Sequence, residues 1–249
     1  LAIFIIVSCL LSNRIDLGAL ENSKIDEASG ISSSKNNPDL LWMHNDSGDL
    51  AKVYGVGLDG TYLGVIRLKG AIARDWEDMC IGPGPEIDID YLYIGDIGDN
   101  FSKFKKKRIH RVKEPIVNSN QDSPFNIKIK DFDTIVFTYP DGNRDAEALM
   151  VDPNTKDLYI LSKRESSVSI YRLPYPQSTS KVIEAEKLGN FTVTPDKSYR
   201  RSDQITAADI SRDGSKIIIK TYYDIIMLNN LNNSVASAFS SEQIKLDYT

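Results

Sequence analysis

Four acidic residues each stand at the start of a short apolar segment, and carboxylates repeated in this way could bind a metal ion. They follow one another at intervals of 50, 70 and 62 residues. Carboxylate oxygens are preferred ligands of Ca²⁺, and carboxylates that gather without a cation repel one another unless they are protonated. We therefore predict a shared cation site formed by Glu27, Glu77, Glu147 and Asp209.

A second apolar segment follows each acid and ends in polar or charged residues. In an antiparallel strand pair, the start of the first strand and the end of the second lie at the same edge. The residues that end the second segments should therefore join the acids. The candidates for ligand contact are His44, Asn45, Asp46, Lys163 and Lys220, and Asp96 ends the second segment of the second pair.

The same residues also have a purely structural interpretation. Carboxylates at strand ends can accept hydrogen bonds from backbone N–H groups in tight corners and hold neighbouring sheets together. Lysines that face two of the acids, Lys163 and Lys220, could neutralise them through ion pairs. The sequence leaves a metal site and an ion-paired scaffold both open.

The elements that would position these residues are short strands in a repeated order. Strand pairs that recur along a chain are typical of the radial blades of a β-propeller, so we predict an all-β propeller of four-stranded blades. After Asn229 the residues are polar and weakly periodic, which predicts an incomplete fourth blade and a missing C-terminal part. The expected strands are 28–32, 40–45, 51–57, 61–68, 77–81, 91–96, 108–112, 134–139, 147–151, 158–162, 168–172, 187–193, 206–211, 216–221 and 224–228.

Composition and motifs exclude several classes of function. The chain has 249 residues and a net charge of −5, which argues against a nucleic-acid partner because such proteins need a basic face. The only histidines, His44 and His110, are a whole blade apart and give no support to a catalytic triad. Residues 55–60 match a dinucleotide fingerprint, but a strand follows them where that motif needs a helix.

The first eleven residues are almost entirely apolar and fit the core of a secretory signal. Within them, Ile6-Val-Ser-Cys9 matches the pattern that bacterial lipoprotein signal peptidase cleaves. We expect residues 1–20 to be a leader and tether, with a lipid on Cys9 as the only contact with a membrane, and residues 21–249 to form the propeller domain. Secretion without a lipid is the alternative; either route gives an extracytoplasmic protein. Cys80 is expected to be a buried thiol in an apolar strand.

Four segments together resemble those of a group of bacterial secreted or lipoprotein β-propellers. They are 42–48, 74–79, 93–100 and 144–149. More distantly, the chain is similar to six-bladed TolB-like and SMP-30/gluconolactonase-like propellers, which implies a six-bladed parent fold. In those lactonases a Glu, an Asn and an Asp hold a central divalent cation, and another Asp is the base; here no Asn stands at a matching position.

Two functions follow as hypotheses. The first is an extracytoplasmic binding or scaffold module with a central Ca²⁺ site and a small-molecule or protein ligand. The alternative is a metal-dependent lactonase or esterase, in which Glu77, Glu147 and Asp209 hold the ion and polarise a water. Asp96 is the expected base of that reaction.

Overall fold

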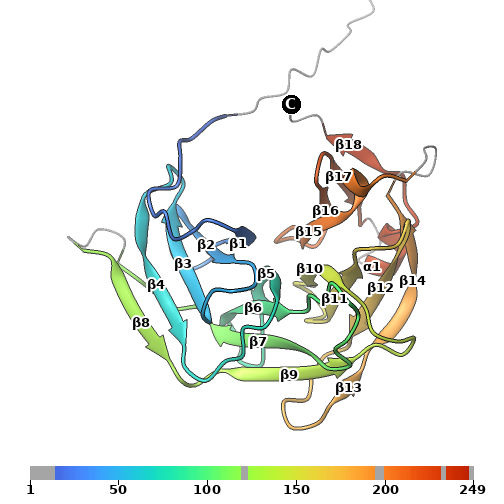
Figure 1. The fold of residues 1–249 in the computed structure, drawn as a ribbon, viewed down its shortest axis with the longest axis horizontal. Coiled ribbons are helices and arrows are strands. Elements are labelled where there is room, and N and C mark those ends of the chain that lie inside the picture. Colours follow the sequence, from blue (N-terminus) through green and yellow to red (C-terminus); the bar gives the residue numbers. More distant parts are fainter. Residues whose placement is uncertain (1–14, 119–122, 194–198, 231–233, 247–249) are drawn as a thin grey trace, which may run out of the picture.

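The strands of the described residues form four β-sheets, which are arranged as the blades of a propeller (Figure 1). The computed structural model describes residues 15–118, 123–193, 199–230 and 234–246. The first strand of each blade lies nearest the centre, and the later strands follow outward (Figure 1). This confirms the all-β propeller class. Cys9 lies outside the described residues.

The strands follow the expected order with ends within two residues of those predicted. Blade one contains β1 (Ala28–Ser33), β2 (Leu40–Asn45), β3 (Lys52–Gly57) and β4 (Tyr62–Leu68). Blade two contains β5 (Trp76–Pro83), β6 (Asp90–Asp96), β7 (Lys107–Lys113) and β9 (Asp133–Thr138). Blade three contains β10 (Ala146–Val151), β11 (Leu158–Ser162), β12 (Ser167–Leu173) and β14 (Glu186–Thr192). Blade four contains β15 (Ile205–Ile210), β16 (Lys216–Thr221), β17 (Ile225–Asn229) and β18 (Ile244–Leu246).

Blade four corrects one expectation from the sequence. The prediction that this blade is incomplete is wrong, because β18 pairs antiparallel with β17 and supplies a fourth strand. The short helix α1 (Val235–Ala238) precedes it, and its buried residues join a core cluster with Phe191 of blade three. Three residues of strand after a polar stretch carry too little periodicity to be recognised in sequence.

Two further strands cross from one blade to the next. β8 (Phe125–Ile129) leaves blade two between β7 and β9 and runs parallel to β4 at the outer edge of blade one. β13 (Ile183–Glu184) leaves blade three in the same way and pairs parallel with β9 of blade two. Blades one and two therefore each have a fifth strand supplied by the blade that follows. The strands expected from the sequence include none between residues 112 and 134, so β8 was not predicted.

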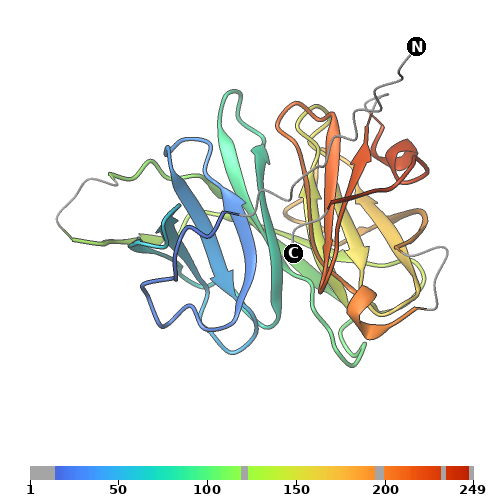
Figure 2. The ribbon, with the colours of Figure 1, turned by 90° about the horizontal axis from the view of Figure 1, so that it is seen from above.

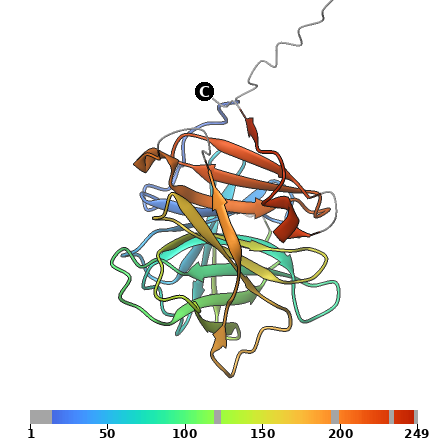
Figure 3. The same cartoon turned by 90° about the vertical axis from the view of Figure 1, so that its right-hand side faces the viewer.

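Most of the core lies between neighbouring blades, in three clusters that each join two of them. All six residues of β10 are buried because blades two and four cover its two faces. Trp42 is fully buried and meets the ring of Phe125 edge-on at 5.9 Å, so the crossing strand β8 contributes to the core of blade one. Cys80 is fully buried, as predicted. Figure 2 shows blades one and four on opposite sides of the inner strand of blade two. Figure 3 shows blade four, in orange and red, above the green strands of blade two.

Each inner strand carries a β-bulge at the same place, and the four bulges define which residues are equivalent. The register of each inner strand shifts between residues 28 and 30, 76 and 78, 146 and 148, and 205 and 207. A bulge leaves one residue unpaired and re-aims its side chain. The four bulged residues are Ser29, Glu77, Glu147 and Thr206.

Asp78, next to a bulge, connects three blades through its buried carboxyl group. Its oxygens accept hydrogen bonds from the backbone N–H groups of Met79 at 2.8 Å, Leu149 at 2.9 Å and Ala208 at 3.3 Å. Each donor stands two residues after the bulge of its own blade. Asp78 therefore fixes the inner strands of blades two, three and four relative to one another.

No helix among the described residues is long and apolar enough to cross a membrane.

Candidate functional site

Glu77 and Glu147 occupy equivalent bulges in blades two and three, so both side chains point to the centre of the molecule. Glu77 is 2% exposed and Glu147 is 7% exposed. Burial of two carboxyl groups side by side is costly unless a proton or a cation compensates for their charge. Among the described residues of the predicted acidic set, only these two place carboxylate oxygens within 4.8 Å of each other.

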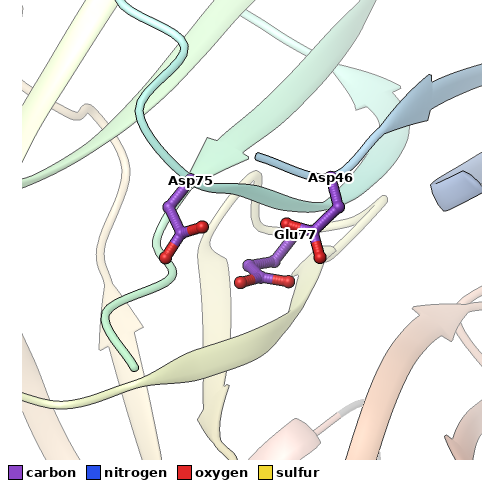
Figure 4. A group of neighbouring side chains, drawn as sticks. All are labelled: Asp46, Asp75 and Glu77. Carbon is purple, nitrogen blue, oxygen red and sulfur yellow. The ribbon is translucent and has the colours of Figure 1, made fainter. Parts of the chain in front are cut away.

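Three carboxyl groups converge on one point next to blade one. Asp46 follows β2, Asp75 precedes β5 and Glu77 lies within β5, and each offers an oxygen within 4.8 Å of the others. Figure 4 shows the three side chains directed toward one another. No ion pair is recorded for any of them within the described ranges. We refer to Asp46, Asp75 and Glu77 as the acidic triad.

A second group, Glu77, Asp145 and Glu147, has the same 4.8 Å spacing but is already supplied with cations. Lys163 Nζ forms a buried ion pair with Glu147 Oε1. Arg164 Nε donates to Asp145 Oδ2 at 2.6 Å, and the other oxygen of Asp145 accepts from the Asp99 backbone N–H at 2.7 Å. The uncompensated negative charge therefore lies in the acidic triad.

The pKa values of the acidic triad reflect this charge. Burial, together with the charges of Glu147 and Asp46, raises the pKa of Glu77 far above its usual range. Burial and the charges of Asp46 and Asp145 raise the pKa of Asp75 to about 6. In the absence of a cation, the site is therefore stable only with protons bound to some of these carboxyl groups.

Gly98 provides the space in which two of these carboxylates lie. A Cβ at this position would stand 2.2 Å from Glu77 Oε1 and 2.5 Å from Asp75 Oδ2. Only a residue without a side chain allows the backbone so close to the carboxylates. The backbone at Gly98 therefore leaves the space that the carboxyl groups of Glu77 and Asp75 occupy.

Asp96, the predicted base, lies behind the acidic triad and positions it. It is fully buried, and its Oδ1 accepts from the backbone N–H groups of Arg74 at 3.1 Å and Asp75 at 2.8 Å. Its Oδ2 pairs with Arg108 Nη1 at 3.3 Å. To take a proton from water, Asp96 would have to exchange these partners, and its catalytic role stays a prediction.

The carboxyl groups of Glu27 and Asp209 do not join the acidic triad, although the backbone of Glu27 accepts a hydrogen bond from Asp46 N–H at 2.9 Å. Glu27 is exposed and stands two residues before the bulged Ser29. Asp209 stands three residues beyond the bulged Thr206 and lines a separate, smaller cavity with Lys35 and Arg212. The equivalent positions in these blades thus hold hydroxyl groups, which explains why four repeated acids do not give a four-membered site.

The predicted ligand-contact residues fall into two sets. His44 is fully buried, with Nδ1 at 2.9 Å from Asn45 O and its ring edge-on to Trp76 at 5.5 Å, so it belongs to the core. Asn45 Nδ2 donates to Lys24 O at 2.7 Å and holds the segment before β1. Asp46, Lys163 and Lys220, by contrast, line a central cavity.

That central cavity has a volume of about 490 Å³ and lies between blades one, three and four. Acidic residues come from blades one and three, and basic and aromatic residues from blades three and four. The side chains that give it its character are those of Glu27, Asp46, Glu147, Lys163, Lys220 and Tyr222. The acidic triad adjoins this cavity through Asp46.

Reasoning from the sequence missed Asp75 and Asp145, although a signal was present. Arg74-Asp-Trp-Glu77 and Arg144-Asp-Ala-Glu147 have the same spacing, and each Glu is the bulged residue of its blade. The acid two positions before a bulged Glu lies close enough for both carboxylates to approach one point. The repeated Arg-Asp-x-Glu pattern was therefore a better guide than the Glu alone.

Comparisons with known proteins assign no family to this chain. No family model and no curated protein sequence matches this chain. Among solved structures, a chain of a nidogen/laminin complex is 12% identical with a TM-score of 0.46, over 83% of this chain and 61% of that one. An auxiliary nutrient binding protein from Bacteroides thetaiotaomicron is 12% identical with a TM-score of 0.42, over 87% and 45%.

The structure of the Dos1 propeller is also similar, at 12% identity and a TM-score of 0.38, over 89% of this chain and 48% of that one. The chain thus spans between about half and three fifths of the length of these proteins. At these identities and TM-scores the similarities say nothing about what this chain binds. The blades described above identify the chain as a β-propeller.

Proposed function

We propose that the protein is a binding module that holds a divalent cation at Asp46, Asp75 and Glu77, with Ca²⁺ as the first candidate. The observation that supports this is the convergence of three carboxyl groups within 4.8 Å, with no ion pair recorded for them among the described residues. Burial and the repulsion between neighbouring carboxylates raise the pKa values of Asp75 and Glu77, and a cation would offset both effects.

The donor set favours a hard cation. All three groups are carboxylates, and His44 and Cys80 are held in the core. Oxygen donors suit Ca²⁺, Mg²⁺ or Mn²⁺, whereas zinc and copper sites draw on imidazole or thiolate. Ca²⁺ accepts irregular geometry and bidentate carboxylates more readily than Mg²⁺ does, which fits side chains that come from two blades.

The proposed setting is extracytoplasmic. Residues 1–20 would form a leader and tether with a lipid on Cys9, and residues 21–249 the propeller domain, as in the bacterial secreted or lipoprotein propellers that the sequence resembles. Extracellular modules bind Ca²⁺ with dissociation constants of about 10⁻⁴ to 10⁻³ M. Millimolar Ca²⁺ outside the cell would then be enough to load the site.

The test is thermal unfolding in chelator and in Ca²⁺, with Glu77→Gln as the site variant. A ligand at 100 times its Kd stabilises the folded state by about 2.7 kcal/mol, which gives a clear rise in Tm. We expect the rise in the wild type and its loss in Glu77→Gln. Asp209→Asn changes charge by the same amount outside the acidic triad and should keep the rise. No Ca²⁺-dependent rise in the wild type would contradict the proposal.

A second candidate is a metal-dependent hydrolase of lactones or esters. It is favoured by the central cavity, which leaves room for a substrate beside the acidic triad. The cation would polarise the carbonyl group or its attacking water, Glu147 would border the reaction space, and Asp96 would have to be released from Arg108. Ca²⁺-dependent turnover of simple lactones or esters that is lost in Glu147→Gln would support this function; a Glu147→Gln variant with unchanged turnover would contradict it.

A further inference from the structure

The central cavity is too large to serve a metal ion alone. Its volume is about 490 Å³, whereas one water molecule in the liquid takes about 30 Å³. Binding sites for small molecules range from about 300 to 1,000 Å³. The space beside the acidic triad is therefore of the size of a small organic ligand.

The walls of the cavity differ in charge. Glu27, Asp46 and Glu147 make one side acidic, while Lys220 and Tyr222 of blade four form the opposite side. Lys163 connects the two sides, since its Nζ pairs with Glu147 and lies 5.4 Å from the centroid of the Tyr222 ring.

Blade four also offers an aromatic surface. Tyr222 follows β16 at the position that Asp46 and Lys163 occupy after β2 and β11. Its side chain is therefore presented toward the centre, and the residue remains 47% exposed. Ile31 of β1 lines the same cavity and is 48% exposed. Two large apolar surfaces thus border a site that also carries charged side chains.

Resting on the cation site proposed above, we propose that the central cavity binds a small carboxylate-bearing molecule together with the cation. Its carboxylate would lie between the cation and Lys220, and its apolar body would pack on Tyr222 and Ile31. Aromatic side chains supply much of the contact area in such sites, and a few charged groups set the orientation.

The cation and the organic anion should support each other's binding. Without a cation, the carboxylate of Asp46 and its neighbours in the acidic triad would repel an incoming carboxylate. A bound divalent ion reverses the local charge and removes that repulsion. Burial lowers the pKa of Lys220, so an anion placed beside its ammonium group would be favoured. By linkage, the anion must raise cation affinity by the same factor as the cation raises anion affinity.

The probe we would use is mandelate, which carries a carboxylate and an aromatic ring, with mandelamide as its neutral counterpart. Calorimetric titrations would measure mandelate binding in chelator and in Ca²⁺, and Ca²⁺ binding with and without mandelate. We expect Ca²⁺ to tighten mandelate binding by at least about fivefold, with an equal factor in the reverse titration and no such factor for mandelamide.

Two lysine variants localise the anion. Lys220→Gln should lose the mandelate effect, whereas Lys216→Gln, an exposed lysine on the same strand and outside the cavity, should keep it. If Ca²⁺ binds the wild type but mandelate binding does not respond to it, or if Lys220→Gln retains the full response, the anion site is refuted and the cation site stands. If the wild type does not bind Ca²⁺, both proposals fail.

Discussion

Glu77 is a buried carboxyl group beside two others, and this placement makes the site sensitive to pH. The unfolded chain releases the proton of an ordinary Glu near pH 4.5, whereas folding raises the pKa of Glu77 well above that value. For Asp75 the change is from 3.8 to about 6. The cation-free folded state therefore holds more protons than the unfolded state over this range.

The sign of the pH effect follows from that difference. Stability falls with rising pH wherever the folded state binds more protons than the unfolded state. In chelator, we expect the Tm of the wild type to fall as the pH is raised from 5 to 7, because the unfolded chain has released the protons of Asp75 and Glu77 over this range whereas folding requires protons to be bound there. Glu77→Gln, which has no proton to lose at this position, should show a smaller fall. Melting curves in chelator at several pH values measure both.

Ca²⁺ must displace those protons, so its binding should release protons and strengthen with pH. We expect the Kd to fall by up to about tenfold per pH unit for each proton released. Titrations at pH 5.5, 6.5 and 7.5, in two buffers with different ionisation enthalpies, give the number of protons. A Kd that is the same at all three pH values would show that the acidic triad is not where the ion binds.

At the scale of the element, the β-bulge decides which side chains meet. The sequence pattern was sufficient to predict all the inner strands and their neighbours within two residues, because alternating apolar residues and turn residues mark them. It was not sufficient to predict the bulge, which shifts the register by one residue without a change in composition. Glu27 and Asp209 were therefore placed with Glu77 and Glu147, although Ser29 and Thr206 are the equivalents.

Contacts between residues that are far apart in the sequence account for the other differences between the predicted and the observed structure. β8 pairs with β4 about sixty residues earlier, and no local feature of residues 125–129 indicates that partner. Asp46 was predicted to face the site and does so, because the strand order brings the end of β2 beside the start of β5. The position of Asp75 could have been inferred only from its spacing to Glu77.

The carboxyl group of Asp78 accepts hydrogen bonds from three inner strands, so its replacement should destabilise the contacts between them. Asp78→Ala removes the acceptor of three backbone N–H groups in β5, β10 and β15. An unsatisfied buried donor costs about 1 to 3 kcal/mol. Burial raises the pKa of Asp78, so Asp78→Ala also removes the cost of burying this carboxyl group, which partly offsets the loss of stability. We expect the free energy of unfolding to fall by about 3 kcal/mol, as measured by urea denaturation.

Two comparisons separate lost hydrogen bonds from lost charge. Asp78→Asn removes the charge and keeps one oxygen acceptor, so it should cost less than Asp78→Ala. Asp131→Ala, at an exposed position, should change stability by no more than about 0.5 kcal/mol. If Asp78→Ala were as stable as Asp131→Ala, the connecting role of Asp78 would be refuted.

For the whole molecule, the acidic triad lies across the junction of blades one and two. Asp46 belongs to blade one, and Asp75 and Glu77 belong to blade two. A cation at this point would join the two blades, so we expect Ca²⁺ to slow amide hydrogen exchange most at the end of β2 and the start of β5. The outer strand β17 of blade four should change little. Hydrogen exchange followed by mass spectrometry, in chelator and in Ca²⁺, measures this difference.

The comparison should use amides that exchange through local opening, because those that need global unfolding slow down everywhere when a ligand binds. Glu77→Gln provides the reference, since Ca²⁺ should produce no difference between its blades. Equal slowing of locally exchanging amides in blades one and four would argue against a cation at the junction.

The crossing strands β8 and β13 bear on how such a chain could gain or lose blades during evolution. Each crossing strand is encoded within one repeat and completes the sheet of the repeat before it. Excision of the segment that encodes blade two would therefore also remove the outermost strand of blade one and uncover Trp42, which packs against Phe125. Duplication of the same segment would give the second copy a crossing strand that completes the sheet of the first copy. A segment of sequence that encodes one blade therefore does not coincide with one sheet, because its crossing strand belongs to the sheet of the preceding blade. Recombination that exchanges one sheet at a time is thus disfavoured.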